Sequence, residues 1–401
     1  MPMLRLEPVV LAFVFSSMLL AVPIVVAERI IMLVRLRFVR YRSPAGARRA
    51  RTGWSIAGWT LLLLLGFSRP GLAEPARLRL SFQLPISGTL GANLVRFKEA
   101  VERDTGDAIT IEILQGAQAL PDRTVANSVM AGEMEMAVAN AVTLVDKVKG
   151  VDVLSLPFLF NSNVFLRAML DPARQSRKLL DDAILENTGA RLLMWQPYGT
   201  NVFFSKGRPA ARPSDITAKR IRASGQIDLE FGRVCGGAPE LIAAGKQYEA
   251  MKTGQIDMAM TAAENVSARN FWEISDTVTR TNHSTVMLLL LINERVWQSL
   301  SPTHRDAISN ASRNAERELW DGLLLRDEEA YAFARTKGMN VVELSSFDLA
   351  EWRACSAPVV ESFMAASGQL GQQLLKQYGV MRTEPCCNPA PDPSGTGYRP
   401  H

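Results

Sequence analysis

The chain has 401 residues, of which 47% are hydrophobic, so it is long enough for two or three domains with buried cores. Its formal net charge of +5 is misleading, because ten of its 45 Lys and Arg residues but only three of its 40 Asp and Glu residues lie within residues 1–74. The rest of the chain carries a net charge of −2, which gives no basis for binding nucleic acid, and no such partner is expected.

Residues 1–73 form a leader with two uncharged apolar runs. The second run, 54–68, follows a cluster of arginines and ends in PGLA (70–73), which predicts a signal peptide over residues 48–73 that is cleaved after Ala73. The first run, 9–27, is nearly long enough to span a bilayer but contains Pro23. It is either a membrane helix or lies upstream of the true start at Met32. We favour the second interpretation, because a cleavable signal needs no second span.

Cysteine and histidine usage gives little support for an enzyme or a metalloprotein. Cysteines occur at 235, 355, 386 and 387, and histidines at 283, 304 and 401. Export permits disulfides, but the adjacent pair at 386–387 in a Pro- and Gly-containing tail resembles neither a metal site nor a disulfide-stabilised core. The best acid–base pair, His283 with Asp276 or Glu273, has no nucleophile beside it. We predict no catalytic residue, no metal and no cofactor.

Strands and helices alternate at the start of the body. Residues 78–83, 109–113 and 134–140 read as strands, and apolar positions over 94–101 and 123–131 read as the helices between them. This order predicts βαβ units in a largely parallel sheet, in which ligands gather at the carboxyl ends of strands. Gln83 and Asn140 end the first and third strands. Both are candidate ligand contacts, although packing in a core or loop explains each equally well.

An internal similarity suggests that the body is duplicated. GEMEMAVA (132–139) matches GQIDMAMT (254–261), and each segment follows a predicted helix end at Gly and opens a strand. Two α/β lobes that face each other across a cleft would produce this pattern, as in ligand-binding proteins that close by a hinge. The methionines of the two segments are most simply core residues.

Two further stretches carry candidate site residues. Trp195 and Gln196 are predicted to end a strand before a crossover between lobes at PYG (197–199), with the Trp195 ring available to stack on a ligand. KRIRASG (219–225) reads as a strand that ends at Ser224 and leads into a helix from about Ile227, which places Arg222 where α/β sheets bind ligands. A guanidinium matches a carboxylate in two hydrogen bonds. The alternative is that Arg222 is only a solvated charge on an edge strand.

The C-terminal third is helical. A long helix is predicted over 302–337, longer than one lobe, with Leu319 and Leu323 on its apolar side and Gly322 as the point where it bends most easily. A short strand over 341–344 and helices over 348–366 and 370–378 follow, and residues 381–401 are predicted to be disordered.

Several motifs, taken in order, resemble one family. They are LPFLF (156–160), KRIR (219–222), YEAMKTGQID (248–257), FWE (271–273), TNH (281–283) and LSP (300–302). With them, residues 77–378 resemble the DctP-type periplasmic solute-binding proteins of tripartite ATP-independent periplasmic (TRAP) transporters.

The resemblance implies a two-lobe α/β Venus-flytrap fold with a long helix spanning both lobes. Lobe I would comprise 76–198 and 286–320, and lobe II 199–285 and 321–380. It also implies a periplasmic, monomeric receptor that binds a small organic anion, performs no chemistry and delivers the anion to an ion-driven membrane permease. In the family a strand-borne arginine grips the ligand carboxylate, and Arg222 matches it.

Two departures from the family pattern bear on the ligand. Asn201 stands where many relatives have a second arginine, and Thr261 where many have an asparagine. Both can hydrogen-bond, but Asn201 brings no charge, so a monocarboxylate is favoured over a dicarboxylate. If residues 9–27 were an anchor, the chain would instead be a membrane-bound ligand sensor. An enzyme acting on a small carboxylate is a further, less favoured alternative.

Overall fold

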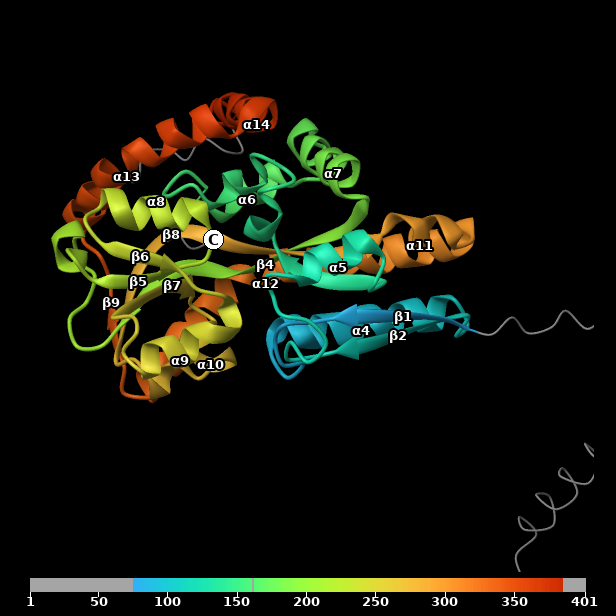
Figure 1. Ribbon diagram of the computed structural model, residues 1–401, viewed down its shortest axis with the longest axis horizontal. Helices are drawn as coiled ribbons and strands as arrows, with labels where there is room; N and C mark the ends of the chain where they lie inside the picture. Colours follow the sequence, from blue (N-terminus) through green and yellow to red (C-terminus); the bar gives the residue numbers. More distant parts are fainter. Residues whose placement is uncertain (1–74, 161, 385–401) are drawn as a thin grey trace, which may run out of the picture. The chain divides into compact units, whose positions relative to one another are not determined.

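A nine-stranded mixed sheet organises the residues that the structure describes, 75–160 and 162–384 of a computed structural model (Figure 1). These residues belong to one compact unit, Ala73–His401. The leader, with its predicted signal peptide and possible anchor, and most of the predicted disordered tail lie outside the described residues. The strands are β1 (Ala76–Ser81), β2 (Ile109–Leu114), β3 (Met136–Asn140), β4 (Ala190–Ser205), β5 (Arg220–Ala223), β6 (Ala238–Leu241), β7 (Met258–Ala262), β8 (Thr277–Asn293) and β9 (Asn340–Val342).

Helices cover both faces of this sheet. They are α4 (Thr89–Asp104), α5 (Val125–Ala131), α6 (Asn163–Met169), α7 (Gln175–Thr188), α8 (Gln226–Val234), α9 (Gln247–Lys252), α10 (Asn265–Ala268), α11 (Glu294–Ser299), α12 (Pro302–Thr336), α13 (Ser346–Ala366) and α14 (Gly368–Met381). In Figure 1, α6, α7, α8, α13 and α14 lie on one side of the sheet, and α4, α9 and α10 on the other. The predicted helices over the C-terminal third are confirmed.

The strand order shows the predicted duplication. The order is β2-β1-β3-β8-β4-β7-β5-β6, so the sequence of pairings from β8 outward through β3 and β1 to β2 is repeated from β4 outward through β7 and β5 to β6. β3 and β7 carry the two similar segments, and each follows a glycine in the left-handed region, Gly132 (φ 80°) and Gly254 (φ 74°). The methionines of these segments, at 134, 136, 258 and 260, are all buried in the core.

Two long strands connect the halves, and here the sequence-based prediction was wrong. β4 and β8 pair antiparallel along almost their whole length, from Ala190 opposite Asn293 to Ser205 opposite Thr277, so the whole sheet is mixed, whereas the βαβ units predicted over β1, β2 and β3 do form parallel pairs. β4 does not end at Gln196. It continues through a register shift between Pro197 and Gly199, because a bulge lets the strand bend without giving up its pairing.

α12 spans both lobes, as predicted. Leu319 packs into a core with β1, β2 and α4, whereas Tyr331 packs into a second core with β7, α9 and α10. On the other face of the sheet a third core runs across both halves, under α7, α8, α13 and α14. The chain therefore has a two-lobe α/β fold in which one helix and two strands pass between the lobes.

Gly322, where α12 is predicted to bend most easily, packs against the side chain of Arg326. α12 is continuous from Pro302 to Thr336, and a Cβ atom at Gly322 would lie 2.6 Å from Nη1 of Arg326. The buried Arg326 donates to the carbonyls of Leu319 (2.8 Å) and Pro197 (3.2 Å). Glycine therefore makes room for a guanidinium that ties α12 to the bulge of β4.

The neighbouring Asp327 holds the other side of the same bulge. Its carboxylate accepts the backbone N–H of Thr200 at 3.1 and 3.3 Å, and a Cβ atom at Gly199 would lie 3.1 Å from Asp327 Oδ1. Gly199 has φ 153°, at the edge of the region that favours glycine.

A disulfide joins Cys235, directly after α8, to Cys355 in α13, and so links two helices that cover the third core.

Candidate functional site

Arg222 lies on β5, inside the sheet between β6 and β7. It is therefore not a solvated edge charge: its side chain is only 4% exposed. The guanidinium donates to the carbonyls of Ile242 (3.0 Å) and Met260 (2.8 Å). Among the described residues no carboxylate forms an ion pair with it. Burial lowers the pKa of Arg222 to about 10, so at neutral pH it is a buried cation that lacks a bonded counter-charge.

A cavity of about 50 Å³ lies against Arg222. It is lined by Phe82, Gln83, Leu84, Asp122, Val138, Asn140, Tyr198, Arg222, Ser224, Ala244, Gln247, Thr261, Asn265, Arg269, Val286 and Leu288. The structure thus brings five of the eight sequence-predicted site residues to one cavity. These are Arg222, Gln83, Asn140, Ser224 and Thr261, and they come from both halves of the sheet because it is the carboxyl ends of β1, β3, β5 and β7 that meet here.

Most uncharged polar side chains of the lining already have hydrogen-bond partners within the protein. Tyr198 donates its hydroxyl to Asn265 (2.7 Å), which in turn donates to Thr261 (2.6 Å). Asn140 accepts the backbone N–H of Val142 (3.2 Å), and so caps the short 3-10 helix Ala141–Leu144. Ser224 is held by Asp228, through its hydroxyl and through its backbone N–H at 3.1 Å. These pairs fix the walls and leave few groups free for a ligand.

Gln247 and Gln83 are the exceptions. Gln247 is 1% exposed, and neither its amide oxygen nor its amide nitrogen has a hydrogen-bond partner. Gln83 donates to Ser81 (3.3 Å), but its buried amide oxygen also has no partner. The sequence prediction missed Gln247. It lies on the buried face of α9 together with Ala250 and Met251.

Two more charged residues complete the lining, and neither was predicted. Arg269, half-buried after α10, adds a positive charge, and Asp122 adds a negative one. With Arg222, the three groups give the lining a net charge of +1. Asp122 also accepts the backbone N–H of Ala244 at 2.8 Å, which joins the loop before α5 to the loop after β6 over the cavity.

The other three predicted residues, Asn201, Trp195 and Gln196, lie outside this lining. Asn201 is 2% exposed and donates to Asp228 and to Ser284, both at 3.3 Å, so it sits behind Ser224. Trp195 and Gln196 are fully buried within β4, and the amide of Gln196 has no partner. Both were expected at a strand end, and they are instead enclosed because β4 runs on past them.

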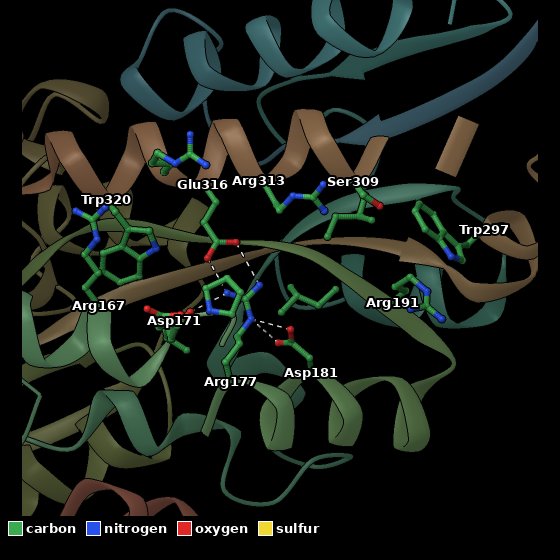
Figure 2. A pocket seen from close by; sticks show the side chains of 15 residues that line it. Arg167, Asp171, Arg177, Asp181, Arg191, Trp297, Ser309, Arg313, Glu316 and Trp320 are labelled. Atoms are coloured by element: carbon green, nitrogen blue, oxygen red, sulfur yellow. Dashed lines mark hydrogen bonds and ion pairs between the residues drawn. The ribbon is translucent and has the colours of Figure 1, made fainter. Parts of the chain in front are cut away.

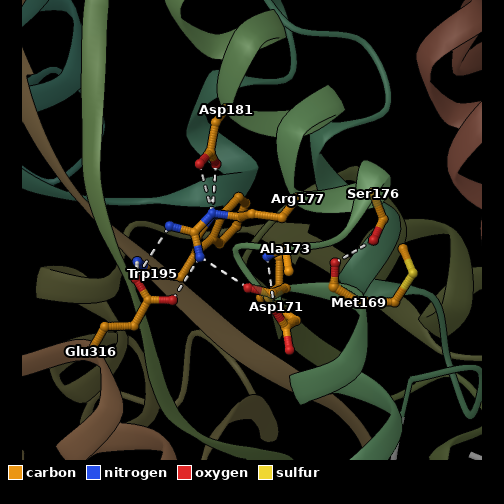
Figure 3. Close-up of polar contacts among 9 residues, drawn as sticks. Met169, Asp171, Ala173, Ser176, Arg177, Asp181, Trp195 and Glu316 are labelled. Atoms are coloured by element: carbon orange, nitrogen blue, oxygen red, sulfur yellow. Dashed lines mark hydrogen bonds and ion pairs between the residues drawn. The ribbon is translucent and has the colours of Figure 1, made fainter. Parts of the chain in front are cut away.

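Trp195 belongs to a different polar cluster, shown in Figure 3. Arg177 on α7 donates to Asp181 (2.7 Å) and to Glu316 on α12 (2.6 Å). Trp195 donates its backbone N–H to Glu316 (3.2 Å) and its indole N–H to Asp181 (3.1 Å). Burial raises the pKa of Asp181 against the lowering effect of Arg177. The cluster ties α7 and α12 to β4.

A pocket of about 430 Å³ opens beside this cluster (Figure 2). Several of its other charged residues also have partners: Arg167 pairs with Asp321 at 2.7 Å, and Arg191 with Glu294 at 2.7 Å. Its buried polar atoms are all hydrogen-bonded among the described residues. We therefore interpret this pocket as a surface hollow over a structural ion cluster, even though it is larger than the cavity at Arg222.

A third hollow, of about 440 Å³, shares Leu84 and Tyr198 with the Arg222 cavity. Glu264, only 6% exposed, lies in it together with Thr89 at the start of α4. Burial raises the pKa of Glu264 to about 7, against the lowering effects of Arg326 and Thr89. This carboxyl group thus titrates near neutral pH.

Neither a metal nor a membrane span is indicated where the chain is described. Over residues 75–160 and 162–384 no three His, Cys, Asp or Glu side chains are arranged to hold a metal ion. Within the same ranges no helix combines the length and the apolar character that a bilayer crossing requires. His283 is completely buried among aromatic rings, and burial lowers its pKa to about 4.

Comparison with known proteins gives consistent matches. Residues 82–367 match the family described as "Bacterial extracellular solute-binding protein, family 7". The chain is 23% identical over 303 residues to a C4-dicarboxylate-binding periplasmic protein of Rhodobacter capsulatus, a match that covers 74% of this chain and 89% of the relative. A Bordetella pertussis extracytoplasmic solute receptor that binds pyroglutamic acid has a TM-score of 0.72 at 22% identity, over 76% of this chain and 99% of that one. A TRAP periplasmic solute-binding protein of Chromohalobacter salexigens with bound D-glucuronate has a TM-score of 0.70 at 21% identity, over 75% and 98%.

Proposed function

The chain belongs to family 7 of the bacterial extracellular solute-binding proteins, and we propose that it is a periplasmic receptor that captures a small organic carboxylate and delivers it to a TRAP-type permease. The three relatives named above support the ligand class, since their names or bound ligands are organic acids. The TRAP and periplasmic relatives support the proposed permease and compartment, and the signal peptide predicted over residues 48–73 agrees with them. As in the rest of this family, the chain acts by binding and release.

The observation that carries the proposal is the buried, unpaired charge of Arg222. A buried cation is costly unless a counter-charge is provided. No carboxylate among the described residues bonds to this one, and it borders a cavity. A ligand carboxylate would supply the missing charge through two parallel hydrogen bonds.

We favour a monocarboxylate. Arg222 and Arg269 against Asp122 leave one net positive charge on the lining, which one carboxylate neutralises. Asn201 supports the same conclusion, because it cannot add a charge and donates to Asp228 and Ser284.

Ligand capture would join the two lobes, which we assign to 76–198 with 286–320 and to 199–285 with 321–380. The hydrogen bond from Ala244 to Asp122 crosses between these lobes beside the cavity, as does the contact of Glu264 with Thr89. Both would form on closure. The bulge of β4 at Pro197–Gly199, held by Arg326 and Asp327, is the proposed hinge.

The test is calorimetric titration of the mature protein with lactate, gluconate, 5-oxoproline and succinate, followed by titration of Arg222→Gln with the best of them. We expect Arg222→Gln to weaken binding by on the order of 2–5 kcal/mol, because it leaves a desolvated carboxylate unpaired. Arg220→Gln is the matched control: Arg220 lies two residues away on the same strand but is exposed and paired with Asp257 at 2.7 Å. Equal affinities for Arg222→Gln and the wild type would contradict the proposal.

A further inference from the structure

Two hollows adjoin the proposed ligand cavity, and their charges have opposite signs. A hollow of about 210 Å³, the basic hollow, shares Ser224 with the cavity and is lined by Arg123 and Lys147 against one acid, Asp146. No Lys or Arg is among the described residues that line the acidic hollow, which is the one of about 440 Å³ that contains Glu264. We infer that the organic anion enters and leaves through the basic hollow, where Arg123 and Lys147 speed its capture. This inference rests on the proposed function, because it concerns the route of the same ligand.

The basic hollow lies on the seam between the two lobes. Its lining combines residues of one lobe, such as Lys147, with residues of the other, such as Leu241. The acidic hollow also touches both lobes, but it lies beside the proposed hinge. It contains Tyr198, which is part of the bulge of β4, and Glu264, whose carboxyl group interacts electrostatically with Arg326, the residue that holds the bulge. Lobes that rotate about a hinge separate least beside it, so the seam at the basic hollow is the side that opens.

Arg123 and Lys147 are available to an approaching anion. Both side chains are exposed, and among the described residues neither is hydrogen-bonded or ion-paired with another side chain. Burial is the main cause that lowers the pKa of Arg222, and the positive charges of Arg269 and Arg123 lower it further. The charge of Arg123 is thus felt at the guanidinium that we propose as the carboxylate contact. Positive potential extends from the exposed edge of the basic hollow inward to the cavity.

A charge at a solvent-filled edge acts mainly on the rate of association. It attracts an anion while the lobes are apart, whereas water and salt screen its contribution to the bound complex. Asp146 offsets one of the two cations, which leaves the basic hollow with a net charge of +1, and Glu264 gives the acidic hollow a negative charge that repels an anion. Arg222, which is buried, acts instead on the rate of release.

The test measures association and dissociation rates by stopped-flow tryptophan fluorescence of the full mature protein. The probe is the acid that binds most tightly among lactate, gluconate, 5-oxoproline and succinate. At about 20 mM salt, the double variant Arg123→Gln, Lys147→Gln should lower the association rate constant by about fivefold or more and change the dissociation rate constant by less than about twofold. At about 0.5 M salt the difference should disappear, because the charges are then screened.

Two further variants separate the position of the charge from its sign and shape. Ser87→Glu, Ser267→Glu is the matched control, because it makes the same charge change of −2 at exposed positions of the acidic hollow. It should leave the association rate constant within about twofold of the wild type. Arg123→Lys keeps the charge and should keep the rate.

The outcomes also separate this inference from the proposed function. Equal losses of association rate in the two double variants, or an effect of Arg123→Gln, Lys147→Gln on dissociation alone, would overturn the route while the probe still binds through Arg222. If none of the four acids binds, or if binding ignores Arg222→Gln, the proposed function itself fails. Where binding leaves the fluorescence unchanged, calorimetry decides: the dissociation constant of Arg123→Gln, Lys147→Gln should rise by the same factor at low salt and match the wild type at high salt.

Discussion

Gly225 follows Ser224 on the loop that leaves Arg222, and it touches the opposite lobe. A Cβ atom here would lie 2.8 Å from Cβ of Val142, which is in the 3-10 helix after β3. The backbone of Gly225 is extended, with φ −153°, so alanine causes no local strain. The contact is therefore between lobes, and its tightness depends on how far they close.

We predict that Gly225→Ala holds the lobes apart and weakens ligand binding by about tenfold or more, while the free energy of unfolding stays within about 1 kcal/mol of the wild type. Calorimetric titration and urea unfolding measure the two quantities. Gly245→Ala is the control, because a Cβ atom there has no neighbour within 4 Å. The double variant Gly225→Ala, Val142→Gly should recover affinity. Full affinity in Gly225→Ala alone would show that this contact does not limit closure.

At the scale of single residues, the sequence predicted Arg222, which the structure places against the cavity, but not Gln247, which lines the same cavity. Arg222 was predicted because strand ends collect ligands and because the KRIR segment matched a family pattern. Gln247 was missed because one polar residue on a short helix, before any fold is known, has no visible cavity to face. Trp195 and Gln196 were placed near the cavity because proline and glycine after them suggested a strand end, whereas long antiparallel pairing carried β4 through.

A buried cluster of charged side chains holds helix α7 against α12. Arg177 is 7% exposed and Glu316 also 7%, and they bond at 2.6 Å with Asp181 and the backbone of Trp195 around them. Removing Glu316 takes a hydrogen-bond acceptor away from two buried donors, the guanidinium of Arg177 and the backbone N–H of Trp195, at a cost of several kcal/mol. An exposed pair on the same helix, Lys178 with Asp182 at 2.6 Å, has no such dependence.

Glu316→Ala should therefore lower the free energy of unfolding by about 3–5 kcal/mol, and Asp182→Ala by at most about 1 kcal/mol. Urea unfolding of both variants at the same salt concentration gives the comparison. Raised salt should reduce the effect of Asp182→Ala further and leave that of Glu316→Ala almost unchanged. Equal losses in the two variants would mean that the buried cluster contributes no more than a surface pair.

The pH dependence of stability belongs to the whole molecule, because several buried groups contribute. Burial raises the pKa of Glu264 to about 7 and those of Asp152 and Asp327 to about 6. For such groups the folded state binds protons more tightly than the unfolded chain, so stability is lost as pH rises through these values. Buried His283, whose pKa is lowered to about 4, acts in the opposite direction between about pH 4 and 6.5.

Comparing Glu264→Gln with the wild type isolates one of these contributions. At pH 4 the two proteins should be about equally stable, since the carboxyl group is then mostly neutral in both the folded and the unfolded chain. The variant should become the more stable one as pH rises from about 4.5, the ordinary pKa of the group, to about 7, and the difference should then level off. It should reach at most about 3 kcal/mol at pH 8. Urea unfolding from pH 4 to 8 measures it, and a difference that stays constant with pH would contradict the assignment of this pKa.

The two-lobe architecture was predictable in outline from the repeated segment at 132–139 and 254–261, since it marks the same junction in each half. The sheet that joins the halves was not. β4 and β8 are 16 and 17 residues long, and PYG (197–199), inside β4, reads locally as the end of a strand. Only the pairing of the two strands with each other, and of α12 with both cores, stabilises them as continuous elements.

The positions of α12 and of the disulfide in the sequence also determine when the chain can fold during synthesis. Leu78 and Leu319 belong to one core, so that core is complete only after α12 has been synthesised. Cys235 forms its disulfide with Cys355, which is synthesised 120 residues later. While the polypeptide leaves the ribosome, no lobe has all its parts until α12 has been made, and α13 follows later still. This order fits the export that we propose: the nascent chain would stay open enough to be threaded through a translocation channel, and the disulfide would form afterwards in an oxidising compartment.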